Sequence, residues 1–123
     1  MRVFSELGTG EALDVTLEIA QPISNLVEDE KLVAELRKTL PKGATNKIAV
    51  MHFGLMKVVK LLPIVLKDHR NDVYAILSPF NGLTVEEIDK QRFPITCKQV
   101  YDLLNDKEFV DFFKSSLGGE QNK

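Results

Sequence analysis

The pattern of apolar and polar positions predicts a helical chain, and its most apolar stretch runs from residue 48 to residue 66. At about 100° per residue, one face of this helix carries Ile48, Met51, Leu55, Val58, Val59, Leu62, Val65 and Leu66. The opposite side is mixed, because further apolar residues lie among or beside Lys57 and Lys60, namely Val50, Phe53, Leu61 and Ile64. A helix that is apolar on more than one side must be covered on more than one side. We therefore expect it to be the central helix, with a kink at Pro63 or two helices meeting near Leu62.

A membrane span is the alternative for a stretch of this length, since roughly 20 apolar residues can cross a bilayer. Lys57 and Lys60 lie near its middle. Each would cost about 2.5–3.5 kcal/mol at the bilayer centre. We therefore expect a buried helix and no membrane contact.

Residues 11–20 fit two patterns. Apolar residues alternate with polar ones there, as in a strand, but Leu13 with Leu17 and Val15 with Ile19 are also pairs that a helix would stack. A strand needs a partner, and no second convincing alternating run exists. We therefore predict a helix.

The remaining helices are marked by capping residues. One is expected to begin at Pro22, one near Asp29, and one at Asp68 or Asn71 that stops at the turn of residues 78–82. A capping box, Thr84 with Glu87, predicts a short helix. A helix opened by Pro94 should point Ile95, Val100, Leu103 and Leu104 inward, and the last helix should carry an aromatic face of Phe109, Phe112 and Phe113.

The predicted fold is all-α: a single small domain, residues 1–117, of about six to eight short helices, followed by a flexible tail, residues 118–123. A chain of 123 residues is about one domain. Its net charge of −2 gives no bulk attraction to nucleic acid. With a single cysteine and no export signal in residues 1–10, we expect a reducing, cytoplasmic location.

Residues for chemistry are sparse. His52 and His69 have no histidine or cysteine neighbour at metal-ligand spacing, and His52 is expected to be structural. Cys97 lies in the first turn of an expected helix, but no general base accompanies it. We therefore predict no catalytic residue, no cofactor and no metal, and a protein that is not an enzyme.

Four segments in order carry a resemblance: ELGTGEALD, LMKVVKLLPIVLKDHRNDVYAIL, FNGLTVEEIDKQ and QVYDLLNDKEFVDFF. Together they resemble the tail assembly chaperones of long-tailed phages and prophages of Gram-positive bacteria. The resemblance implies a helical, non-enzymatic protein of the host bacterial cytoplasm, absent from the mature virion, that coats the apolar tape measure protein. It also implies a frameshift-extended form that recruits tail tube subunits.

A chaperone for an apolar helix should expose apolar surface rimmed by charge. The candidate partner-binding residues are therefore Val50, Phe53, Lys57, Lys60, Leu61 and Ile64, with Phe109, Phe112 and Phe113 as a second patch. The apolar members of both sets are either core or interface, and self-association is a further use of such surface. A small helical DNA-binding or regulatory protein of a phage or mobile element is the alternative function.

Overall fold

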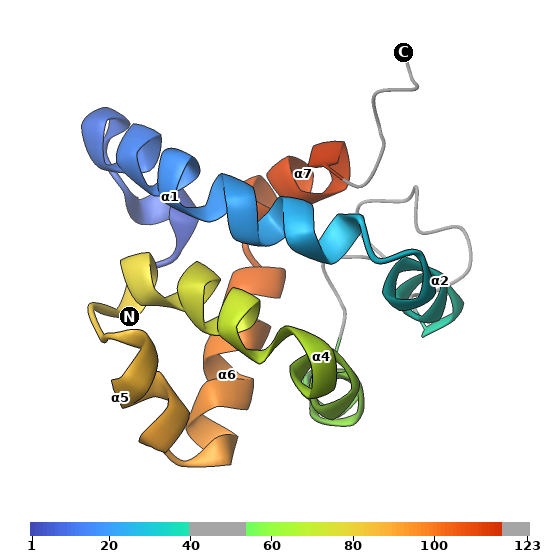
Figure 1. The fold of residues 1–123 in the computed structure, drawn as a ribbon. Helices are drawn as coiled ribbons and strands as arrows, with labels where there is room; N and C mark the ends of the chain where they lie inside the picture. The colour runs from blue at the N-terminus through green and yellow to red at the C-terminus, as the bar shows by residue number, and fades with distance from the viewer. Residues whose placement is uncertain (40–53, 117–123) are drawn as a thin grey trace.

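The computed structural model describes residues 1–39 and 54–116 and is helical, with no strand in these two ranges (Figure 1). A 3₁₀ helix, η1, comprises Phe4–Glu6. The α-helices are α1 (Thr9–Val27), α2 (Glu30–Thr39), α4 (Leu55–Asn81), α5 (Val85–Lys90), α6 (Phe93–Leu104) and α7 (Lys107–Ser116). The all-α prediction is confirmed. Val50, Phe53, His52 and the tail of residues 118–123 lie outside the described residues.

Helix α4 is the centre of the arrangement. It contacts α1, α2, α5 and α6, while α7 contacts α6, α1 and η1. In Figure 1, α1 and α7 lie on one side of α4, and α5 and α6 lie on the other. The longest helix is thus covered on more than one side, as its apolar surface requires.

Helix α1 confirms the choice of helix over strand for residues 11–20. Val15 and Ile19 are buried, and Leu13 and Leu17 are exposed, so one side of the helix enters the core. A new helix was expected to begin at Pro22, but α1 runs through this residue without a break. Its buried face continues past the proline, and this packing offsets the hydrogen bond that the proline cannot donate.

Helix α4 begins at Leu55, after an extended N-cap at Gly54, and residues 48–53 of the apolar stretch lie outside the described residues. Two helical segments meet within α4 at His69, close to the second helix start expected at Asp68 or Asn71, and together they reach Asn81. The non-helical backbone angles of α4 are at His69 (φ −128°, ψ 33°), and the kink predicted at Pro63 is not confirmed. The kink therefore coincides with a polar cluster described below.

Three local signals were read correctly. Thr84 and Glu87 form the capping box, with Glu87 N donating to Thr84 Oγ1 over 3.1 Å. Pro94 lies in the first turn of α6, and Gly82 ends α4 with φ +74°. Ile95 was expected to be buried but is 44% exposed. It lies half a turn from Leu104 around the helix, so both cannot face the core.

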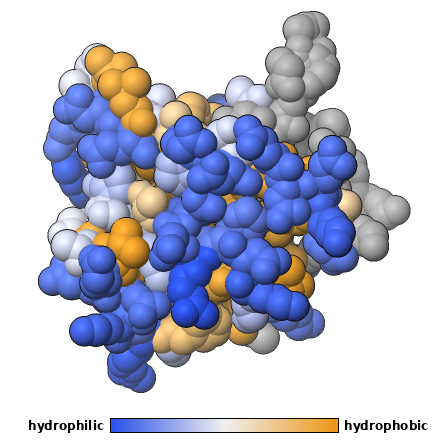
Figure 2. Space-filling model, in the orientation of Figure 1, coloured by the Kyte–Doolittle hydropathy of each residue, from blue (hydrophilic) through white to orange (hydrophobic). Residues whose placement is uncertain are grey.

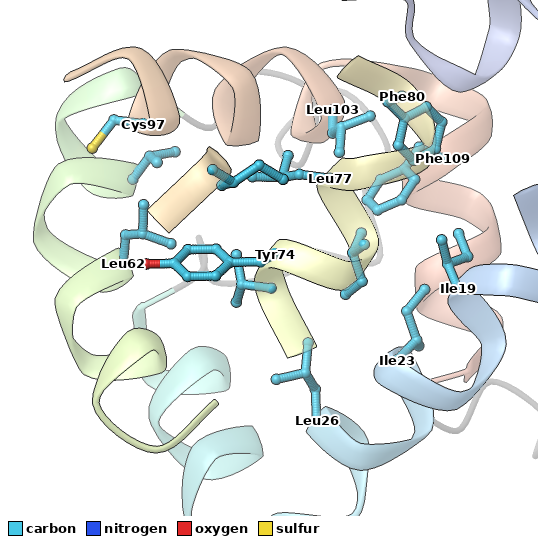
Figure 3. Packing of buried hydrophobic residues seen from close by; sticks show 14 of the residues in the cluster. Ile19, Ile23, Leu26, Leu62, Tyr74, Leu77, Phe80, Cys97, Leu103 and Phe109 are labelled. Carbon is cyan, nitrogen blue, oxygen red and sulfur yellow. The ribbon is translucent and has the colours of Figure 1, made fainter. Parts of the chain in front are cut away.

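The core joins α1, α4, α6 and α7. Ile19 and Ile23 of α1, Leu77 of α4 and Leu103 of α6 are almost fully buried, and Figure 3 shows their side chains turned toward one another. Phe109 of α7 packs edge-to-face on Phe80, with ring centroids 6.0 Å apart. This core leaves one apolar space incompletely filled.

Candidate functional site

An apolar pocket of about 140 Å³ lies between five helices and is partly open. Twelve residues of the described part of the chain line it, and all twelve are apolar: Leu26, Leu32, Leu62, Val65, Val73, Ile76, Leu77, Val100, Leu103, Leu104, Phe109 and Phe113. Several of them are labelled in Figure 3. An engineered apolar cavity of about 150 Å³ stays dry and binds benzene. The pocket is thus suited to one branched or aromatic hydrocarbon group, and none of its described lining residues would bind a polar substrate.

The kinked helix α4 forms much of the pocket wall. Leu62 and Val65 precede His69, whereas Val73, Ile76 and Leu77 follow it. Leu26 from the end of α1 and Leu32 from the start of α2 complete another part of the lining. The shape of the pocket therefore depends on the angle at the kink and on the position of α2.

The predicted aromatic patch divides between two places. Phe109 is buried and Phe113 is half-buried; both line the pocket, and their rings stack with centroids 6.3 Å apart. Phe112 points elsewhere, against Phe4, and lines a groove between α1 and α7.

The predicted patch on the central helix divides as well. Leu61 is only 8% exposed and belongs to the core, whereas Ile64 is 47% exposed. Lys57 and Lys60 are exposed on the same side of α4 as Ile64. None of these four residues lines the pocket.

A second exposed apolar surface was not anticipated from the sequence. Leu13 and Leu17 are 59% and 70% exposed, one turn apart on α1. Figure 2 shows hydrophobic atoms at this end of α1, at the upper left. A groove of about 400 Å³ lies beside them, lined by Thr16, Ala20, Ser24, Val27 and Phe112. The helical spacing of these leucines was the available signal, but it did not tell which pair faced the core.

His69 lies at the kink between two carboxylates. Its Nε2 is 2.8 Å from Asp29 Oδ2, and its Nδ1 is 3.0 Å from Asp72 Oδ2. The hydrogen bond to Asp29, followed by that to Asp72, raises the pKa of His69. The hydrogen bond from His69 in turn lowers the pKa of Asp29. We call these three residues the Asp–His–Asp clasp.

Two further groups of the described residues, Cys97 and Tyr74, are held in the packed interior of the protein. Cys97 is buried, and this burial raises the pKa of its thiol, which disfavours a thiolate nucleophile. The hydroxyl of Tyr74 donates to Asp89 over 3.0 Å, and burial is the main cause of its raised pKa. Across residues 1–39 and 54–116, no three His, Cys, Asp or Glu residues are grouped to hold a metal ion.

Comparisons with known proteins add no assignment. No protein-family model, curated protein or solved structure matches the chain. Among the helices of the described part of the chain, none is both long and apolar enough to cross a membrane.

Proposed function

We propose that this protein binds an apolar helical segment of another protein and keeps it from aggregating, as a tail assembly chaperone does for a tape measure protein. The observation that carries the proposal is the partly open pocket between five helices, whose described lining is wholly apolar. A helix-in-groove partner is recognised by apolar anchor side chains that enter such spaces.

Affinity must come from more than this pocket. Burying one large apolar side chain contributes about 1.5–3 kcal/mol, whereas micromolar binding needs about 8 kcal/mol. The exposed surface of α4 around Lys57, Lys60 and Ile64 offers further contact for the flank of a client helix. Self-association would add more, because several linked copies on one long client bind by avidity.

The phage setting rests on the four sequence segments that resemble the tail assembly chaperones. In this proposal the client is the tape measure protein, and the protein acts in the host bacterial cytoplasm without entering the virion. Tail tube subunits are recruited through an extended form. The protein has a binding role and no catalytic one.

Co-expression with a helical tape measure segment that is insoluble alone tests the proposal. Val65 lines the pocket and Val59 does not, yet both are half-buried residues of α4. We expect the wild type and V59F to co-elute with the client in size-exclusion chromatography. V65F should lose it, because the new ring fills the space that the client needs.

Circular dichroism and thermal unfolding of both variants establish that the fold is kept. Ile64→Ser then tests the exposed surface of α4 around Lys57 and Lys60, and it should weaken co-elution without filling the pocket. A wild type that leaves the client in the pellet would overturn the function, and DNA retention at low salt would then favour a regulatory protein. A folded V65F that binds the client as well as V59F does would exclude the pocket as the site.

A further inference from the structure

The Asp–His–Asp clasp needs two N–H donors from one imidazole ring. Each ring nitrogen of His69 lies within 3.0 Å of a carboxylate oxygen. A neutral imidazole carries one N–H, and only the imidazolium carries two. When His69 loses its proton, one nitrogen lone pair therefore faces a carboxylate oxygen, and one of the two contacts is lost.

The contact to Asp29 crosses between elements. Asp29 lies between α1 and α2, and its Oδ1 accepts a hydrogen bond from Leu32 N over 3.1 Å, which caps α2. Its backbone carbonyl accepts from Val33 N. The same carboxylate thus holds the first turn of α2 and the ring at the kink of α4.

The other carboxylate of the clasp, Asp72, also ties α4 to α1. Asp72 Oδ1 accepts from Asn25 Nδ2 over 2.8 Å, while Asp72 Oδ2 faces His69 Nδ1. Asn25 is in the last turns of α1, next to Leu26 of the pocket lining. Both sides of the clasp therefore meet at the junction of α1 and α2.

We propose that the clasp is a proton-dependent latch that holds the start of α2 against the kink of α4 and thereby sets the wall of the apolar pocket. Leu26 and Leu32, on either side of Asp29 in the chain, are the lining residues that move when it opens. The role of the latch in client binding rests on the proposed function. The latch itself is a property of the protein alone.

The titration of both groups defines the working range. The pKa of His69 is raised above its ordinary value of 6.5, so the stability from its contacts is fully present below 6.5 and is lost as pH rises through the raised pKa. The pKa of Asp29 is lowered from 3.8, so its share is present above 3.8 and is lost as pH falls through the lowered pKa. The latch is therefore closed between these two ordinary values and opens as pH rises through the raised pKa of His69.

Among the described residues, few other charges act on the His69 ring. Asp29 from the α1–α2 junction and Asp72 from α4 are the groups whose charge raises its pKa. Neighbouring charged residues are exposed to solvent: Glu28, Glu30, Lys31, Lys67, Asp68 and Arg70. We therefore assign the pH dependence to the Asp–His–Asp clasp.

Two variants distinguish loss of the latch from a general loss of protein stability. Asp29→Asn keeps an N-cap for α2, because asparagine caps as well as aspartate does, but it removes the carboxylate that holds His69. His69→Gln keeps a polar side chain that does not titrate. Neither residue lines the pocket.

The test is NMR of the full chain between about pH 5 and pH 8.5, which spans the ordinary histidine range. Nitrogen shifts of His69, assigned by their absence in H69Q, should show an imidazolium that persists above pH 6.5. Amide protection in the first turn of α2, corrected for intrinsic exchange, should fall about three- to tenfold as His69 deprotonates, the order of the net contribution of one hydrogen bond. D29N and H69Q should show no such step.

A His69 that titrates at or below its ordinary value, or equal pH profiles in the wild type and both variants, would overturn the latch. Client binding is measured afterwards and separately. If the step in α2 protection is present but no client binds at any pH, the proposed function fails and the latch stands. If client binds equally at both ends of the pH range although the step is present, the link to the pocket is overturned.

Discussion

At the residue scale, two neighbours on α4 provide the sharpest test of the packing. Leu61 is 8% exposed and Ile64 is 47% exposed. Leu61→Ala should lower the free energy of unfolding by about 2–5 kcal/mol, because it leaves a cavity in the core. Ile64→Ala should change it by less than about 0.5 kcal/mol, as surface substitutions usually do. Urea denaturation of both variants measures the difference, and equal losses would contradict the observed burial.

The sequence could not separate these two residues. Both lie beside lysines on a helical wheel of α4, and both are aliphatic. Which one is covered depends on where the neighbouring helices pack, and that is a tertiary property. The same holds for α1, where two equivalent pairs were visible and only Val15 with Ile19 entered the core.

At the scale of elements, the end of α4 depends on one left-handed residue. Gly82 has φ +74°, and a Cβ placed there would meet no atom within 4 Å. Gly82→Ala should therefore cost about 1–2 kcal/mol through backbone strain alone. Thermal unfolding checks this, and Gly82→Asn should lose less, since asparagine tolerates the left-handed region.

Gly10 is the matched control for Gly82. It also has open space around its Cβ position, but it lies inside α1 without a positive φ. Gly10→Ala should raise stability by about 0.4–1 kcal/mol, because alanine loses less chain entropy on folding. A destabilisation of equal size at both glycines would show that the sign of φ is not the cause.

Local sequence signals predicted the ends of helices well, but they predicted the effect of proline on helix boundaries less well. The Thr84–Glu87 box and the Gly82 stop depend on groups a few residues apart, so the sequence contains all of their partners. Pro22 was expected to begin a helix, but buried residues on both sides carry α1 through it. The kink of α4 is at His69. The side chain of His69 contacts Asp29, which is remote in sequence, so no local pattern marks this position.

At the scale of the whole molecule, the all-α architecture was predictable and the candidate site was not. The pocket is lined by side chains from five helices. A small unfilled space between helices does not change the hydrophobic pattern of the sequence, so the pattern could not predict it. Phe109 and Phe113 were nevertheless singled out, since an aromatic face near the end of the chain had to pack on something. The clasp joins Asp29, His69 and Asp72, and each of them reads alone as an ordinary surface residue.

The exposed leucines of α1 carry the last prediction, that of self-association. Leu13 and Leu17 are flanked on α1 by exposed Asp14 and Glu18, and no lysine or arginine occurs in this helix. The exposed side of α4 instead carries Ile64 among lysines, so the two faces are complementary in charge. Because the faces differ, contact between copies would be heterologous and would allow more than two copies to join.

Light scattering at increasing concentration should therefore show mass above that of the monomer, and this excess should fall with added salt, which screens the exposed charges. The double variant L13S/L17S should return the protein to the monomer with its helical content unchanged, since both side chains are already exposed. Ile95→Ser is the matched control, because Ile95 is an exposed apolar residue on α6, outside both faces. A wild type that stays monomeric at every concentration, or an equal effect of the control, would exclude α1 as the contact and leave the pocket to act in single copies.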